Sequence, residues 1–130
     1  MADERRFRRA AAPTPREVPD DAILTQYGRL ESAKPTFRTA PRFPGETDLS
    51  MLWGKIDGET AALMVRGRRG DSRDVSRHVR AGDLRAAGFV VENTPTRRNP
   101  DHISVTVAAG AVKWDDDQVA AFTRAVSPTM

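Results

Sequence analysis

The clearest alternation of apolar and polar residues along the chain lies at residues 102–108. Ile103, Val105 and Val107 alternate with polar residues, which predicts a strand that buries one face. The same alternation places His102 on the opposite, polar face. This segment is therefore predicted to be a half-buried strand of a sheet.

The last apolar pattern of the chain has a helical period. Val119, Phe122 and Val126 share one helix face, and the aspartates at 115–117 occupy the predicted first turn, where the helix dipole favours negative charge. Pro128 ends this helix. Adjacent helical residues do not face one another, so the three aspartates are assigned to capping and no metal site is predicted there.

Residues 57–58 read Asp-Gly, a dipeptide typical of tight hairpin turns. The flanking apolar segments, Met51–Ile56 and Thr60–Arg66, are therefore predicted to be paired strands. Residues 71–80 have no clear period and stay unassigned. A short helix is predicted over Asp83–Gly88, with Asp83 at its start and Gly88 at its end.

Together with a strand at Phe89–Asn93, these elements predict an α+β fold in the order β-β-α-β-β-α. Two hairpins, each followed by a helix, would form a small, mostly antiparallel sheet with helices on one face. The compact domain is expected to span residues 49–127.

Residues 1–48 are predicted to form an extended, largely irregular arm, because its prolines remove hydrogen-bond donors and disfavour helix. A short docking helix is expected at residues 20–30, where Ile23, Tyr27 and Leu30 follow the spacing i, i+4, i+7. Such a helix is too short to be stable alone, so it would dock on a protein surface. Six apolar anchors of the arm are predicted to contact a partner: Phe7, Ile23, Tyr27, Leu30, Phe37 and Phe43.

Length and composition narrow the functional classes. The 130 residues suit one domain, and the absence of cysteine excludes disulfides, thiolate metal sites and a thiol nucleophile. The same absence fits a reducing, cytoplasmic setting. No apolar run is long enough to span a membrane, and no motif indicates a metal or another cofactor, so neither is expected.

The net charge is +3, and the positive excess is concentrated between residues 66 and 85, a segment that contains seven arginines and only three aspartates. Arginine binds phosphate through two parallel hydrogen bonds and keeps its charge at ordinary pH. This favours nucleic acid as an alternative partner. The candidate nucleic-acid contacts are Arg66, Arg68, Arg69, Arg73, Arg77 and Arg80, together with Arg5, Arg6, Arg8 and Arg9 of the arm.

The two histidines offer a second alternative. His78 and His102 could serve as acid and base in metal-independent RNA cleavage, with Arg73 stabilising the negatively charged transition state. A histidine at the start of a strand more often makes local hydrogen bonds, so an enzymatic role is the less favoured interpretation.

The favoured prediction is a non-enzymatic interaction protein. It would be a small accessory or structural subunit whose arm docks onto a larger protein assembly, or onto further copies of itself. Nucleic-acid binding and a small ribonuclease are the two alternatives, and no membrane partner is expected.

Overall fold

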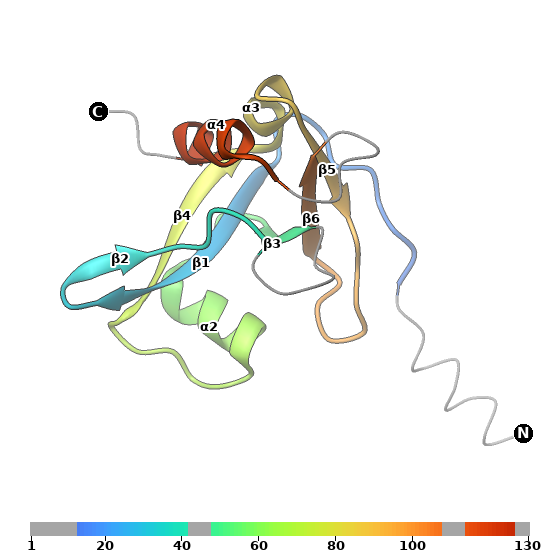
Figure 1. The fold of residues 1–130 in the computed structure, drawn as a ribbon. Coiled ribbons are helices and arrows are strands. Elements are labelled where there is room, and N and C mark those ends of the chain that lie inside the picture. The colour runs from blue at the N-terminus through green and yellow to red at the C-terminus, as the bar shows by residue number, and fades with distance from the viewer. Residues whose placement is uncertain (1–12, 42–47, 108–113, 127–130) are drawn as a thin grey trace, which may run out of the picture.

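The computed structural model describes residues 13–41, 48–107 and 114–126 (Figure 1). Within these ranges, six strands form one antiparallel sheet and three helices pack against it, which confirms the predicted α+β class. The elements are β1 (Ile23–Glu31), β2 (Lys34–Thr36), β3 (Leu49–Trp53), α2 (Gly58–Arg66), β4 (Asp74–Arg80), α3 (Ala81–Ala86), β5 (Phe89–Asn93), β6 (His102–Val107) and α4 (Asp116–Val126).

Strand β1 lies within the sheet and pairs with three other strands, β2, β3 and β4. One of its edges pairs with β4 from Ile23 to Arg29. The other edge pairs with β3 at Leu24 and Thr25, and with β2 from Arg29 to Glu31. Strands β6 and β5 extend the sheet beyond β3. Between its contacts with β3 and β2, this edge of β1 is paired with no described strand.

The helix predicted at residues 20–30 is wrong, because Ile23–Glu31 is strand β1. The apolar spacing was misleading because both faces of β1 are covered, and a strand covered on both faces need not alternate. Leu24, Thr25 and Gln26 are consecutive and all buried. A domain boundary between residues 48 and 49 would therefore separate hydrogen-bonded strands.

The strand predicted at Thr60–Arg66 is also wrong, since these residues lie in helix α2. Asp57 does not start a hairpin turn. Its carboxylate accepts a hydrogen bond from the Thr60 backbone N–H, which caps the helix. Gly67 ends α2 in a left-handed conformation with φ of 69°. The unassigned segment 71–80 contains β4, so the observed order is β-β-β-α-β-α-β-β-α.

The main core lies between the sheet and helices α3 and α4. Phe122 of α4 is fully buried, and its ring lies 5.8 Å from the ring of Phe89 and 5.7 Å from that of Trp114. Leu84 of α3 and Val126 of α4 belong to the same cluster. The amphipathic pattern that predicted the C-terminal helix therefore identified a real core face.

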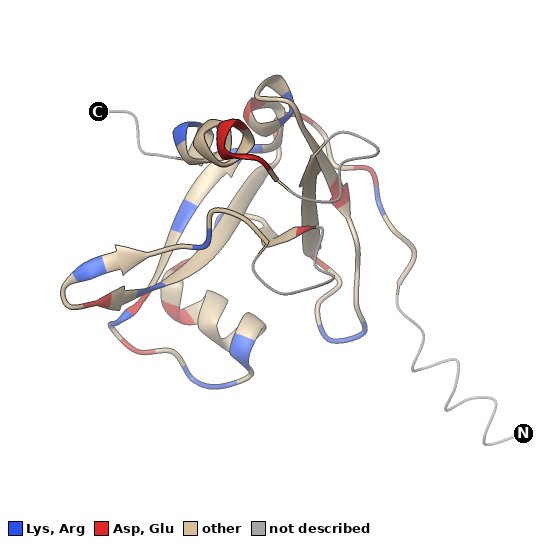
Figure 2. Ribbon diagram, in the orientation of Figure 1, with Lys and Arg blue, Asp and Glu red and all other residues tan. Residues whose placement is uncertain are grey.

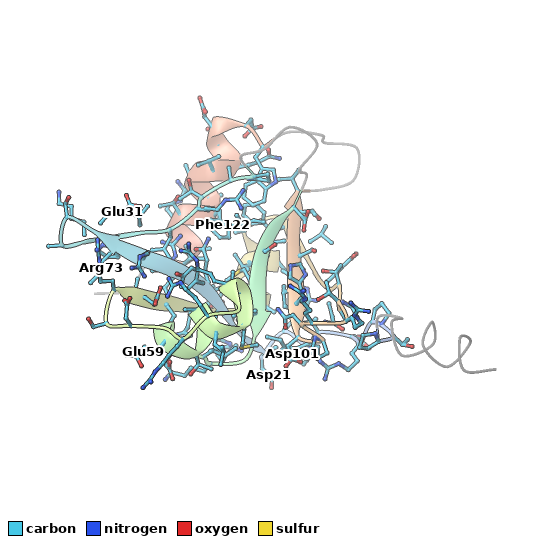
Figure 3. All side chains as sticks on the ribbon, turned by 90° about the horizontal axis from the view of Figure 1, so that it is seen from below. Asp21, Glu31, Glu59, Arg73, Asp101 and Phe122 are labelled. Atoms are coloured by element: carbon cyan, nitrogen blue, oxygen red, sulfur yellow. The ribbon has the colours of Figure 1, made fainter. Side chains whose placement is uncertain are left out.

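The helices lie on both sides of the β1–β4 pair, whereas the sequence pattern placed them on one face. Gln26 and Arg77 face α4, and the Arg77 guanidinium lies 6.0 Å from the Phe122 ring centre. Neighbouring side chains alternate along a strand, so Thr25 and His78 point to the other face, where both bond to Ile56 just before α2. Figures 1 and 3 show α2 and α4 on opposite sides of this pair.

Candidate functional site

A cavity of about 380 Å³ opens where β1 turns away from β3. The two strands pair only at Leu24–Trp53 and Thr25–Leu52, and beyond these pairs they diverge. Helix α2 and the loop between β5 and β6 flank the opening. In Figure 3, α2 lies between β1 and the β3–β6 pair.

The cavity wall combines apolar and cationic side chains. Leu52 of β3 and Met64 and Val65 of α2 supply apolar surface. Arg38 and Arg98 also line the cavity and add positive charge to its wall. Among the described residues, none forms a hydrogen bond or an ion pair with the Arg98 side chain, so this cation is available to a ligand.

A chain of polar side chains adjoins the cavity on the polar face of β3 and β6. His102 Nε2 lies 3.0 Å from the hydroxyl of Ser50, and both residues line the cavity. His102 Nδ1 lies 2.8 Å from the Thr94 hydroxyl and 3.2 Å from the Thr94 carbonyl oxygen. The Thr94 hydroxyl is 2.6 Å from that of Ser104, which donates to Asp48 at 2.8 Å.

The structure does not bring the two predicted catalytic histidines together. His78 is paired with Thr25, Thr25 with Leu52, and Leu52 with His102. Adjacent strands lie about 4.8 Å apart, so these three steps separate the two histidines by about 14 Å. The His78 ring instead bonds to the Ile56 carbonyl, 3.0 Å away.

Arg73 does not join either histidine. It lies in the turn just before β4, outside the strand that carries His78. Its guanidinium donates to the Leu30 carbonyl at 3.2 Å. The three residues proposed for ribonuclease chemistry therefore do not converge.

Part of the predicted arginine-rich surface is bound to one internal carboxylate. The Asp74 side chain is 0 % exposed and accepts hydrogen bonds from Tyr27, Arg29 and Arg68. The Asp71 backbone N–H is a fourth donor, 2.8 Å away. These bonds, that of Tyr27 above all, hold the pKa of Asp74 well below its usual range. Arg68 is therefore already paired.

Arg77 is partly buried on the α4 face. Its Nε donates to the Gln26 side chain at 2.7 Å, and its guanidinium lies 4.3 Å from the Phe37 ring centre. Burial lowers the pKa of Arg77 to about 10. This arginine supports the packing of the segment after β2 and is not presented to a phosphate backbone.

The remaining predicted nucleic-acid contacts in the described part of the chain, Arg66, Arg69, Arg73 and Arg80, are exposed. Figure 2 shows acidic residues interspersed with basic ones in the α2–β4 loop. Arg5, Arg6, Arg8 and Arg9 lie outside the described residues, so the structure does not place the N-terminal basic cluster.

Four of the six predicted docking anchors are used within the domain. Ile23, Tyr27 and Leu30 belong to β1, and Phe37 packs against β1 at Gly28, where a Cβ would come within 2.5 Å of its ring. The other two anchors, Phe7 and Phe43, lie outside the described residues.

Several residues of the cavity were not singled out by the sequence. Ser50 lines the cavity and flanks a predicted strand, but only the register of β3 with β6 shows that it meets His102. Thr94 and Asp48 lie beside the cavity, where Thr94 contacts His102 and Asp48 accepts from Ser104. Met64 was assigned to a strand, which hid its role in the wall. The one available signal was the polar face of the 102–108 strand.

No group of three histidine, aspartate or glutamate side chains that could hold a metal ion occurs in residues 13–41, 48–107 and 114–126. Among the helices in the same ranges, none is both long and apolar enough to cross a membrane.

Comparison of the chain with protein-family models, with curated proteins and with solved structures finds no match.

Proposed function

We propose that this protein binds a small organic molecule that carries both an apolar group and a negative charge. The main support for this proposal is the cavity between β1 and β3. Its volume of about 380 Å³ falls at the lower end of the range of ligand pockets. Its walls join apolar side chains of α2 and β3 to two arginines, a combination that suits an amphipathic anion.

The cavity is a consequence of the sheet topology. The edge of β1 that pairs with β3 at Thr25 is free of described strands at Gln26 and Tyr27, and all three residues line the cavity. Buried Gln26 donates to the Arg38 backbone carbonyl, which fixes the chain that carries the Arg38 side chain. The opening is therefore built into the backbone and does not depend on one side-chain rotamer.

The amphipathic dye 8-anilinonaphthalene-1-sulfonate tests the proposal, because it combines aromatic rings with a sulfonate. Fluorescence titration should show saturable binding. Arg98→Ala should weaken this binding about tenfold, which corresponds to the loss of one charge-assisted hydrogen bond of about 1.5 kcal/mol. Arg97→Ala is the matched control, since Arg97 is exposed but does not line the cavity.

A second pair of variants tests the apolar wall. Met64→Trp should fill the cavity and abolish dye binding, whereas Leu63→Trp should leave it unchanged because Leu63 is 56 % exposed and outside the cavity. Equal effects of the two substitutions would show that the dye binds elsewhere.

The role as an interaction subunit stays a prediction. Of its six predicted anchors, Phe7 and Phe43 lie outside the described residues. Nucleic-acid binding likewise stays a prediction, supported by the exposed side chains of Arg66, Arg69, Arg73 and Arg80.

A further inference from the structure

The hydrogen bonds beside the cavity have a defined direction. At neutral pH a carboxylate accepts hydrogen bonds and cannot donate them. Ser104 therefore uses its single hydroxyl hydrogen to donate a hydrogen bond to Asp48. Because that hydrogen is engaged, the Ser104 oxygen can only accept a hydrogen bond from the Thr94 hydroxyl, 2.6 Å away.

The donor and acceptor roles of Ser104 and Thr94 also determine the tautomer of His102. The Thr94 hydroxyl donates its hydrogen bond to the Ser104 oxygen. The Thr94 hydroxyl oxygen can therefore only accept a hydrogen bond from His102 Nδ1. The Thr94 carbonyl, 3.2 Å from the same nitrogen, can also only accept. Nδ1 therefore carries the proton, and Nε2 of the neutral ring has a free lone pair. Ser50, 3.0 Å from Nε2, is left as the donor.

We propose that Ser50 is a nucleophile and His102 its general base in an esterase site that opens into this cavity. A hydroxyl that donates to an imidazole, itself oriented by a third group, is the arrangement shared by serine hydrolases of unrelated folds. Ser50 is solvent-exposed and lines the cavity, so a substrate can reach it. Thr94, Ser104 and Asp48 act as positioning residues.

The proposed reaction is hydrolysis of a carboxylic ester. The Ser50 oxygen bonds to the ester carbonyl carbon as its proton passes to His102 Nε2. The carbon–oxygen bond to the alcohol then breaks, and the leaving alkoxide takes that proton. Water attacks the acyl group on Ser50, again giving its proton to His102. The bond between the acyl carbon and the Ser50 oxygen then breaks, the proton on His102 returns to that oxygen, and the carboxylic acid leaves, so ester and water give acid and alcohol.

The cavity also supplies surroundings for the developing charge. The carbonyl oxygen becomes negative when Ser50 attacks, and positive groups fixed nearby stabilise such an oxyanion. Arg38 and Arg98 line the same cavity. Its apolar wall suits a short acyl chain. This substrate class rests on the proposed function, because the ester must first bind in the cavity.

Hydrolysis of p-nitrophenyl butyrate by the full-length chain tests the inference. Ser50→Ala and His102→Gln should each lower the rate of p-nitrophenolate release about 10²–10⁴-fold, the usual contribution of a general base. Ser72→Ala and His78→Gln are the matched controls, since neither side chain lines the cavity. Equal rates in the wild type and Ser50→Ala would overturn the inference.

Covalent labelling gives a readout that does not depend on turnover. An alkyl fluorophosphonate should modify the chain once, with loss of fluoride, and peptide mass mapping should place the adduct on Ser50. His102→Gln should suppress this labelling. An adduct on another serine, or none, would contradict the assignment.

The positioning role of Thr94 is separable from a purely structural one. Thr94→Val removes the hydroxyl acceptor of Nδ1–H and leaves only the Thr94 carbonyl, 3.2 Å away, so it should lower the rate and alter its pH profile, while Thr94→Ser should restore both. A rate loss in Thr94→Val without any change of the pH profile would contradict the role.

Dye binding separates this inference from the proposed function. Ser50→Ala should still bind 8-anilinonaphthalene-1-sulfonate. If the wild-type protein binds the dye at the cavity but neither hydrolyses the ester nor reacts with the fluorophosphonate, the esterase inference is wrong and the proposed binding function stands. If dye binding does not depend on the cavity residues, the proposed binding function is wrong.

Discussion

At the scale of single residues, Asp74 shows how one buried carboxylate orders a basic loop. A charge removed from water is costly unless it is paired and hydrogen-bonded. Tyr27, Arg29 and Arg68 provide that pairing, and the pKa of Arg29 is raised mainly by its bond to Asp74. The arginines near this loop therefore have a structural role that their spacing in the sequence did not reveal.

The stability of the protein should depend on pH through Asp74. Its folded-state pKa lies well below the ordinary value of 3.8. The stabilisation that the carboxylate contributes is thus fully present above pH 3.8 and is lost as the pH falls toward the lower folded-state value. Urea unfolding, followed by tryptophan fluorescence between pH 2 and pH 7, should show this loss.

Asp74→Asn should be less stable than the wild type at neutral pH and should show a smaller loss on acidification. Asp21→Asn is the control, because Asp21 is exposed and makes no side-chain bond with a described residue. An unchanged acid dependence in Asp74→Asn would show that other carboxylates control it.

At the scale of elements, the sequence predicted β5, β6, α3 and α4 and failed at β1 and α2. The period of the apolar residues predicted β6 and α4, whereas Asp83 and Gly88 predicted α3. Segment 60–66 follows the Asp-Gly dipeptide and was therefore assigned to a hairpin strand, yet the cap at Asp57 and the left-handed Gly67 select a helix. Tertiary packing on both faces of β1 removed the period there.

The candidate site was predictable only in part, for the same reason. The alternation at 102–108 placed His102 on the polar face of its strand, and Ser50 and Thr94 do lie beside it. Its contact with Ser50 depends on the pairing of Leu52 with His102, which joins residues fifty positions apart. No local pattern encodes a register of that kind.

Helix α2 depends on a close approach to β4. A Cβ on Gly58 would lie 2.1 Å from the Asp74 backbone oxygen, and backbone cannot rotate away as a side chain can. Gly58→Ala gains up to about 1 kcal/mol of helix propensity. Overpacking of about 1–3 kcal/mol should outweigh this gain and lower the free energy of unfolding.

Denaturant unfolding measures the effect of Gly58→Ala directly. Glu59→Ala, at the exposed neighbouring position, should change the free energy of unfolding by less than about 1 kcal/mol. A Gly58→Ala variant as stable as the wild type would mean that α2 can move away from β4.

At the scale of the whole molecule, residues 13–41 are part of the folded domain. Buried Val18 and Leu24 belong to the main core, and β1 pairs with both β3 and β4. A chain truncated to residues 49–126 should therefore fail to fold. Its amide proton NMR spectrum should lack dispersion, and a well-dispersed spectrum would show that the predicted boundary at residue 49 is sufficient.

The long-range pairing of β1 also has a consequence during protein synthesis. Thr25 pairs with His78, so β1 leaves the ribosome fifty-three residues before its full-length partner strand. At about 5–20 residues per second, this interval lasts about 3–10 s. During this time β1 can pair only with β2 and β3, along one of its edges. The edge from Ile23 to Arg29 stays unpaired until β4 has been translated, which makes β1 a segment that chaperones can bind.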